Sequence, residues 1–175
     1  MDYYYLISSL PMLKYDGEMA ISYDKFLEMC KPCVSEKKYQ ILENLSIASD
    51  NGVLVDEWAK FYDDLKTEMT YQRNRKLGHR VDASDKKDDA ISKHITSAVN
   101  NKNPFDAEKM LLAFEFEKLD EFIGLHFFDD YALMGYALKL KLLERKAMFK
   151  KEDGKKEFNR IINELEEQIM SMEQE

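Results

Sequence analysis

Residues 131–149, YALMGYALKLKLLERKAMF, constrain the fold of this chain more than any other stretch. At the spacing of an α-helix they carry two apolar stripes that point in different directions. One stripe is Leu133, Tyr136, Leu140, Leu143 and Ala147, and the other is Tyr131, Met134, Leu138, Leu142 and Phe149. The consistently polar sector holds Lys139, Lys146 and Lys150. The pattern therefore predicts a central helix that packs against neighbours on two sides.

Gly135 lies in the interior of this helix, where Gly costs about 1 kcal/mol relative to Ala. We interpret it as a small residue beneath a bulky side chain of a neighbouring helix. The alternative is a neighbouring backbone that crosses close to it.

Helix start and stop signals extend the helical pattern over the second half of the chain. Asn103 and Pro104 suit the N-cap and first position of a helix that runs to Gly124, and Asp129 suits the N-cap of the central helix. The last segment carries apolar residues four and three positions apart at Phe158, Ile162, Leu165, Ile169 and Met172. The sequence thus predicts an all-α helical bundle with three long C-terminal helices at about residues 104–123, 130–151 and 155–173.

The first half predicts shorter helices packed against these three. The apolar run at residues 3–13 is expected to be buried, as either a strand or a helix. Ser22 and Ser35 are N-cap candidates, for one helix that ends before Pro32 and a second that reaches residues 50–52. A longer helix with Trp58 on its apolar face starts near Asp56 and ends at Gly78.

A chain of 175 residues predicts a single helical domain over residues 1–175. The alternative is two sub-lobes, residues 1–81 and 90–175, joined by the charged linker 82–89. The net charge of −8 argues against a general nucleic-acid-binding protein, because binding to the phosphate backbone needs a cationic surface.

The longest uncharged run, eleven residues at 3–13, is shorter than the roughly 20 residues that cross a bilayer. The run is flanked by an acid and interrupted by Pro11, which disfavours a signal peptide. We therefore expect no direct membrane insertion and a cytoplasmic location.

Residues that could carry chemistry lack the context that the chemistry needs. Cys30 and Cys33 form a C-x-x-C pair, but the pair follows a helix, and we interpret it as reduced structural thiols, with a redox or zinc site as the alternative. His126 is interpreted as a packed or capping imidazole. Four acids could supply metal ligands in a bundle: Glu115, Glu117, Asp120 and Glu121. None of the three His has a Glu three residues before it, which removes the usual di-iron signature, and Glu117 and Asp120 lie opposite the apolar face, so we expect a solvated surface. We expect no catalytic residue, no cofactor and no metal, and thus a protein that is not itself an enzyme.

The dense basic segment of the first half, residues 72–80, lies at the end of the Trp58 helix. Cations at a helix C-terminus are favoured by the helix dipole alone. A partner-binding role is the other interpretation, and its candidates are Arg73, Arg75 and Lys76.

Five blocks of the chain resemble, in order, a bacterial family of unassigned function whose members are encoded beside V-type (V/A-type) ATP synthase subunits. The blocks are YYYLISSLPML, ISYDKFLEMC, EWAKFYDDLKTEM with RNRKLG, NPFDAEKMLLAFEFEKLDEF, and HFFDDYALMGYALKLKLLERKAMF. That family is distantly similar to the all-helical C subunit (d in eukaryotes), which seats the central shaft on the membrane ring, although this chain is much shorter than its three-lobed form.

The resemblance implies a non-catalytic peripheral component or assembly factor of a proton- or sodium-translocating V-type ATP synthase. Its partners would be subunits of the central stalk or the membrane ring, and its place would be peripheral at the inner membrane through the ATP synthase. The alternative from the residues alone is an unrelated helical adaptor, or a small-ligand-binding bundle with Arg73, Arg75 and His126 near a pocket.

Overall fold

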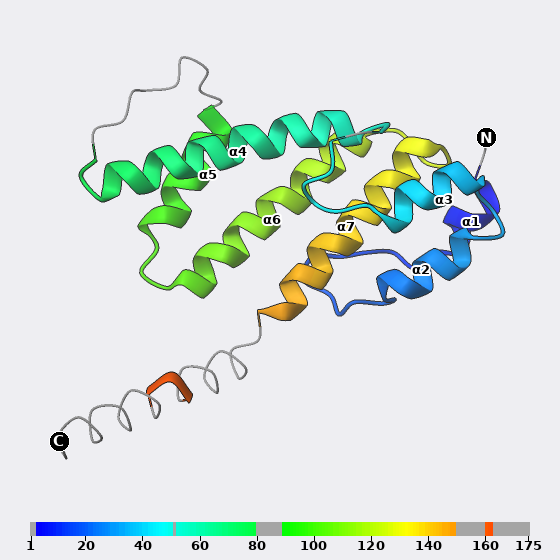
Figure 1. Cartoon of the computed structure of the whole chain (residues 1–175), viewed down its shortest axis with the longest axis horizontal. Helices are drawn as coiled ribbons and strands as arrows, with labels where there is room; N and C mark the ends of the chain where they lie inside the picture. Colours follow the sequence, from blue (N-terminus) through cyan, green and yellow to red (C-terminus); the bar gives the residue numbers. More distant parts are fainter. Residues whose placement is uncertain (1–2, 51, 80–88, 150–159, 163–175) are drawn as a thin grey trace, which may run out of the picture. The chain divides into compact units, whose positions relative to one another are not determined.

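The computed structural model describes residues 3–50, 52–79, 89–149 and 160–162. Within these ranges the chain is helical and contains no strand, which confirms the all-α bundle. The chain divides into two compact units, residues 1–144 and 145–175. The first unit contains α1 (Tyr4–Ser9), α2 (Tyr23–Cys30), α3 (Glu36–Glu43), α4 (Val55–Lys76), α5 (Asp89–Asn100), α6 (Pro104–Ile123) and most of α7 (Asp130–Met148) (Figure 1).

The helix starts follow the local chemistry that the sequence predicts. Side-chain oxygens of four cap residues accept hydrogen bonds from backbone N–H groups in the first turns of α2, α3, α6 and α7: Ser22, Ser35, Asn103 and Asp129. α2 ends at Cys30, before Pro32, and α4 ends just before Gly78, whose φ of 78° is in the left-handed region that favours glycine. Helix boundaries set by short-range capping were therefore predictable.

Among the N-terminal helices, the end of α3 differs from the expectation. α3 ends at Glu43, seven residues before Asp50, because the side chain of Asn44 donates to the Gln40 carbonyl and closes the last turn. α4 has 22 residues, which agrees with the longer helix predicted from near Asp56 to Gly78, and α1–α3 are the shorter N-terminal helices. Residues 4–9 form a helix rather than a strand.

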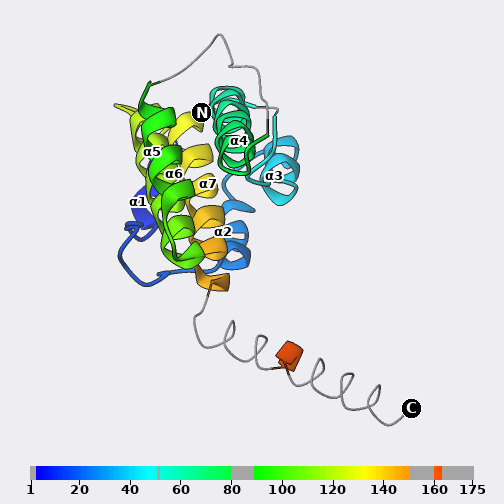
Figure 2. The ribbon, with the colours of Figure 1, turned by 90° about the vertical axis from the view of Figure 1, so that its left-hand side faces the viewer.

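α7 is the central helix of the first unit, and it lies between α6 on one side and α2, α3 and α4 on the other (Figure 2). Leu140 has no exposed surface, like several other residues of both apolar stripes. The ring of Tyr136 stacks on Phe26 of α2 with centroids 5.4 Å apart, and Asp130 pairs with Lys38 of α3 at 2.7 Å. α7 therefore has neighbours on two sides, as the two apolar stripes predict.

Lys139 was expected on an exposed polar sector of α7, and this expectation is wrong. Its residue surface is only 9% exposed. The ammonium forms an ion pair with Asp120 of α6 and lies 4.8 Å from the ring centroid of Phe116. Lysine can be buried here because its aliphatic stem packs against the core while its charge meets an acid at the surface.

Gly135 lies beneath a bulky neighbour, as predicted. A Cβ atom added to Gly135 would overlap the side chain of Ile123 on α6 and would come within 3.6 Å of Leu54. The glycine thus allows α6 to approach α7 closely, which explains its position inside a core helix.

The buried stripes of α7 end at Leu143, next to the boundary between the two units. Ala147 and Phe149, which were assigned to the stripes, are exposed. α7 ends at Met148 rather than at residue 151. Of the third long helix predicted at 155–173, the structure describes residues 160–162, which are helical, and the remainder lies outside the described residues.

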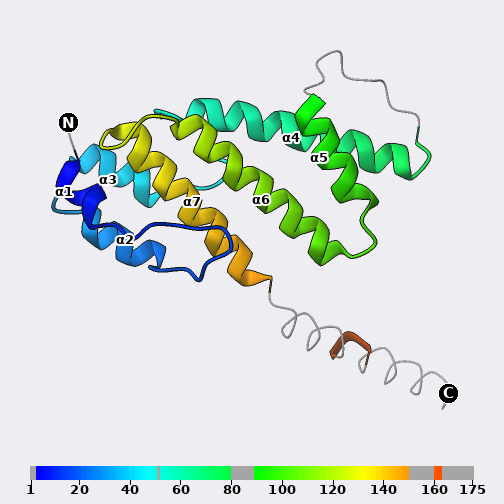
Figure 3. The ribbon, with the colours of Figure 1, turned by 180° about the vertical axis from the view of Figure 1, so that it is seen from behind.

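α4, α5 and α6 pack side by side at one end of the first unit (Figures 1 and 3). α4 and α5 flank the predicted linker 82–89, which apart from Asp89 lies outside the described residues. α4 buries Trp58, Phe61 and Leu65, and the Trp58 indole donates to the Ile47 carbonyl at 2.8 Å. One face of α4 is therefore joined to the core that α6 and α7 share.

The segment between α1 and α2 runs across α7 (Figure 3) and contacts α6 through Tyr15. Tyr136 of α7 donates its hydroxyl to the Pro11 carbonyl at 2.9 Å, and Tyr15 donates to the Lys109 carbonyl of α6 at 2.7 Å. These two hydrogen bonds fix the segment across the bundle.

Candidate functional site

The predicted partner-binding residues lie together at the C-terminal end of α4. Arg73, Arg75 and Lys76 are exposed, as the sequence predicts. Leu77, which follows them, is 71% exposed. The end of α4 therefore presents two guanidinium groups and an ammonium group beside an apolar side chain.

Lys76 also has a structural contact that the sequence did not reveal. Its ammonium donates to the carbonyl of Val99, in the last turn of α5. Carbonyl groups in the last turn of a helix lack partners within the helix and carry partial negative charge. Lys76 thus joins the ends of α4 and α5, and only Arg73 and Arg75 can be exchanged without removing this contact.

A buried polar cluster fixes α4 against α5 two turns before the basic end. Glu68 is 8% exposed, and its Oε1 accepts hydrogen bonds from Gln72 Nε2 at 2.7 Å and from Ser92 Oγ at 2.8 Å. The sequence did not identify Ser92 of α5 as the partner of this cluster. The cluster holds the basic end of α4 in a defined position.

A surface cavity of about 250 Å³ lies between α3, the chain before α4, and α7. It is lined by, among others, Lys37, Lys38, Ile41, Val53 and Met134. Lys38 is already paired with Asp130. Arg73, Arg75 and His126, the residues named for a small-ligand site, do not line this cavity. The small-ligand alternative stays a prediction.

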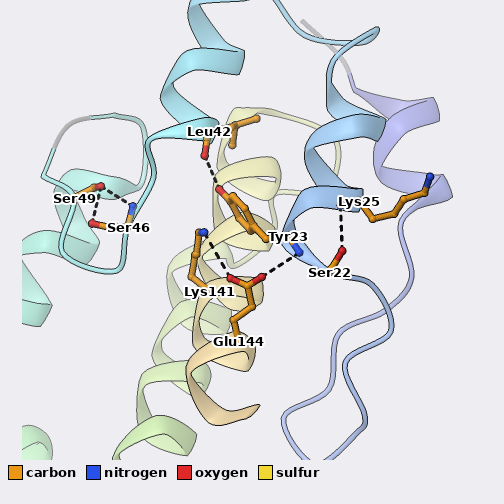
Figure 4. A network of polar contacts seen from close by, with 8 residues as sticks. All are labelled: Ser22, Tyr23, Lys25, Leu42, Ser46, Ser49, Lys141 and Glu144. Carbon is orange, nitrogen blue, oxygen red and sulfur yellow. Dashed lines mark hydrogen bonds and ion pairs between the residues drawn. The ribbon is translucent and has the colours of Figure 1, made fainter. Parts of the chain in front are cut away.

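A polar network joins α2 to α7 inside the bundle (Figure 4). The hydroxyl of Tyr23 donates to the Leu42 carbonyl at 2.7 Å, and its backbone N–H donates to Glu144 at 3.2 Å. Lys141 lies 3.5 Å from the centroid of the Tyr23 ring and 3.6 Å from Glu144. Burial, reinforced by Cys30 and Glu144, raises the pKa of Tyr23 above its ordinary value. The tyrosine therefore acts as a neutral hydrogen-bond donor that fixes α2.

Cys30 and Cys33 differ in environment. Cys30 is buried at the end of α2, whereas Cys33 is exposed in the following turn. Burial, with a smaller contribution from Cys33, raises the pKa of the Cys30 thiol to about 12. A thiol with such a pKa supplies little thiolate, which is the nucleophile and the metal ligand. The geometry is that of a packed thiol.

The acids and the histidine named from the sequence do not converge. Glu117 and Asp120 are exposed, as expected for a solvated surface, whereas Glu115 is 2% exposed. His126 pairs with Asp129 and stacks on Tyr131 with ring centroids 4.3 Å apart. The imidazole thus packs on Tyr131, and the residue that caps α7 is its partner Asp129.

Asp129 serves two contacts at the start of α7. Its partial burial acts to raise its pKa, but hydrogen bonds from His126 and from the Ala132 N–H outweigh that effect and hold the pKa below its usual value. The carboxylate therefore caps the helix as an anion.

The surface that the sequence missed is an exposed aromatic patch, defined by Tyr4, Tyr5, Leu125, Phe127 and Phe128. Their exposed fractions are 54%, 87%, 88%, 63% and 38%. Residues 3–13 were expected to be buried. In the structure, only two of them are buried: Leu6 in α1 and Tyr3, which precedes it. Because successive helical residues point about 100° apart, three consecutive tyrosines cannot all face one core. That periodicity was the available signal.

Among the described residues, no group of three or more His, Cys, Asp or Glu side chains is arranged to hold a metal ion. Over the same residues, no helix combines the length and the apolar character needed to cross a membrane.

Comparison with known proteins gives one family. The model of a family described as "Protein of unknown function (DUF2764)" matches residues 93–169, which is somewhat less than half of the chain. The matched range runs from α5 through α6 and α7 and into the last segment. No curated protein and no solved structure matches the chain.

Proposed function

We propose that this chain is a non-catalytic peripheral component or assembly factor of a V-type ATP synthase, and that it contacts the central stalk or the membrane ring. The observation that carries the proposal is the ordered resemblance of five sequence blocks to a family encoded beside ATP synthase subunits. The last two of those blocks fall within the range matched by the family model. Such a role would place the chain in the cytoplasm, peripherally at the inner membrane.

The packing of the first unit is consistent with a mechanical or scaffolding role. α4, α6 and α7 have 22, 20 and 19 residues, so each is about 30 Å long. Buried contacts join α6 to α7 at Gly135 and α4 to α5 in the Glu68 cluster. A coupling element resembling the C (d) subunit needs rigid helices that keep partner surfaces at fixed separation, and it does not need a nucleotide site.

Arg73 and Arg75 at the end of α4 are the proposed contact with an acidic surface of a stalk or ring subunit. Guanidinium groups form bidentate hydrogen bonds with carboxylates and steer an acidic partner toward them. Lys76 contributes positive charge at the same place but is held by the Val99 carbonyl.

The proposal is tested by capture from native cells. Protein tagged after residue 175 should recover ATP synthase subunits under gentle lysis. Arg73→Glu/Arg75→Glu should reduce recovery at low salt, with a smaller difference at high salt, where charges are already screened. The matched control is Lys37→Glu, which reverses an exposed charge on α3 and should leave recovery unchanged.

Recovery of no ATP synthase subunit by the wild-type chain would contradict the assignment and favour an adaptor that serves another complex. If the Arg73→Glu/Arg75→Glu variant recovers as much ATP synthase as the wild type, the chain still binds the complex, but the end of α4 is not its contact.

A further inference from the structure

The aromatic patch is a continuous and fixed surface at the junction of α1 with the loop between α6 and α7. The ring centroids of Tyr4 and Phe128 are 4.7 Å apart, those of Tyr4 and Tyr5 are 5.5 Å apart, and those of Phe127 and Phe128 are 6.4 Å apart. The backbone N–H of Tyr3 donates to the Phe128 carbonyl at 2.8 Å. The two parts of the patch are thus joined by both backbone and rings.

The loop that carries half of the patch is held at both ends. It begins at Gly124, whose φ of 51° turns the chain out of α6, and it ends at Asp129, which caps α7. His126, between Leu125 and Phe127, is stacked on Tyr131. Large apolar side chains held in fixed exposed positions are expected at an interaction surface, because they lose little conformational freedom on binding.

The surroundings of the patch are acidic. Residues 119–138 contain four acids and no Lys or Arg, and residues 3–13 contain no charged side chain. Three bases from neighbouring positions approach this region, and all are already paired: Lys38 with Asp130, Lys118 with Glu121, and Lys139 with Asp120. The side chain of Asp129 is 45% exposed and that of Glu121 is 56% exposed. The patch therefore combines exposed aromatic rings with negative charge.

We propose that the aromatic patch binds a partner-protein segment that carries Arg or Lys side chains beside aliphatic ones. Aliphatic groups would cover Leu125 and the rings, cations would lie over the faces of Tyr5 and Phe127, and Asp129 would supply charge complementarity. Patch-to-patch contact with a second copy would bring acids together, and an anionic lipid surface would meet the same repulsion. The inference holds whether or not the partner belongs to an ATP synthase.

The test uses two synthetic amphipathic peptides about 18 residues long, or roughly five helical turns. They share one leucine face, and their flanking positions are Arg in one peptide and Glu in the other. We expect fluorescence anisotropy to show at least roughly tenfold tighter binding of the Arg peptide to the full chain.

Three variants locate the binding. Tyr5→Ser/Phe127→Ser removes two highly exposed rings and should weaken binding of the Arg peptide roughly tenfold without changing thermal unfolding. Asp129→Asn keeps a good N-cap residue but removes the charge, and it should weaken binding several-fold. Leu77→Ser at the end of α4 is the matched control and should leave the affinity unchanged.

Equal affinity for the Arg and Glu peptides would overturn the proposal. The same holds if the Tyr5→Ser/Phe127→Ser variant binds the Arg peptide as tightly as the wild type does. Two other outcomes would assign the patch to a different occupant and equally overturn it. One is concentration-dependent self-association that the double variant abolishes, and the other is binding to vesicles containing phosphatidylserine that depends on the same rings.

Discussion

α7 and α4 are helices of similar length that the fold uses in different ways. α7 is buried on almost every side from Ala132 to Leu143, and even its Lys139 is covered. α4 buries one stripe of side chains, which is apolar at Trp58 and polar at the Glu68 cluster. Beyond the cluster, the last turn of α4 is basic and exposed. We therefore expect substitutions in α7 to lower the stability of the first unit more than substitutions at the end of α4, on which little of the core depends.

The same substitution in the two helices should have very different costs. Leu140→Asp places a charge where no surface is exposed, and it should lower the free energy of unfolding by several kcal/mol, a large part of the stability of a typical domain. Leu77→Asp, at a side chain that is 71% exposed, should change it by less than about 0.5 kcal/mol. Chemical denaturation gives both values, and equal midpoints would remove the distinction between the helices.

Lys139 tests whether α7 is buried on its charged side as well. Lys139→Asp puts a second carboxylate beside Asp120 in a covered position, so we expect a cost close to that of Leu140→Asp rather than that of an exposed lysine. Lys139→Met keeps the apolar stem over Phe116 and should cost less than about 1 kcal/mol, because Asp120 is solvated. If Lys139→Asp were nearly neutral by denaturation, this side of α7 would be open to solvent.

Gly135 tests the close approach of α6 to α7. Gly135→Ala improves helix propensity, but the new methyl group would overlap Ile123, and we expect a net loss of about 1–3 kcal/mol. Ile123→Ala should make the glycine substitution neutral or stabilising in the double variant. A double-mutant cycle measures this coupling, and additive effects would show that the two residues do not meet.

Cys30 reports burial beside α7 through pH. Because its folded pKa of about 12 lies above the ordinary value of 9.0, the neutral thiol contributes stability that is present below pH 9 and is lost as the pH rises toward 12. Other buried groups titrate in the same direction, so the measured quantity is the slope of unfolding free energy against pH for the wild type minus that for Cys30→Ala. In the folded protein, iodoacetamide should modify Cys33 and spare Cys30. Equal slopes and equal alkylation would mean that Cys30 is accessible.

Much of this arrangement could be predicted from local sequence, because helix caps act within one turn. Ser22, Ser35, Asn103 and Asp129 each start a helix with their own side chain. The apolar stripes of α7 up to Leu143 could be predicted because the helical periodicity alone places their residues on common faces. The long helix expected at residues 155–173 remains a prediction, as does its packing against another helix.

Contacts between distant segments could not be predicted in this way. Lys139 is buried because Asp120 lies on the helix beside it, and Glu68 is buried because Ser92 reaches it from α5. At the candidate site, exposure of Arg73 and Arg75 was predictable from the end of an amphipathic helix. The contact of Lys76 with the Val99 carbonyl of α5 could not be predicted. Every residue has a backbone carbonyl, so the sequence does not indicate which one a lysine will contact.

Native-state hydrogen exchange of backbone amides tests the contrast between α7 and the end of α4 most directly. Amides of residues 133–143 should exchange only through global unfolding, with a free energy equal to that from denaturation. Amides in the last turn of α4 should exchange through local fraying at a much lower free energy. Exchange of the α7 amides by local opening, at a free energy as low as that of the α4 terminus, would contradict a central α7.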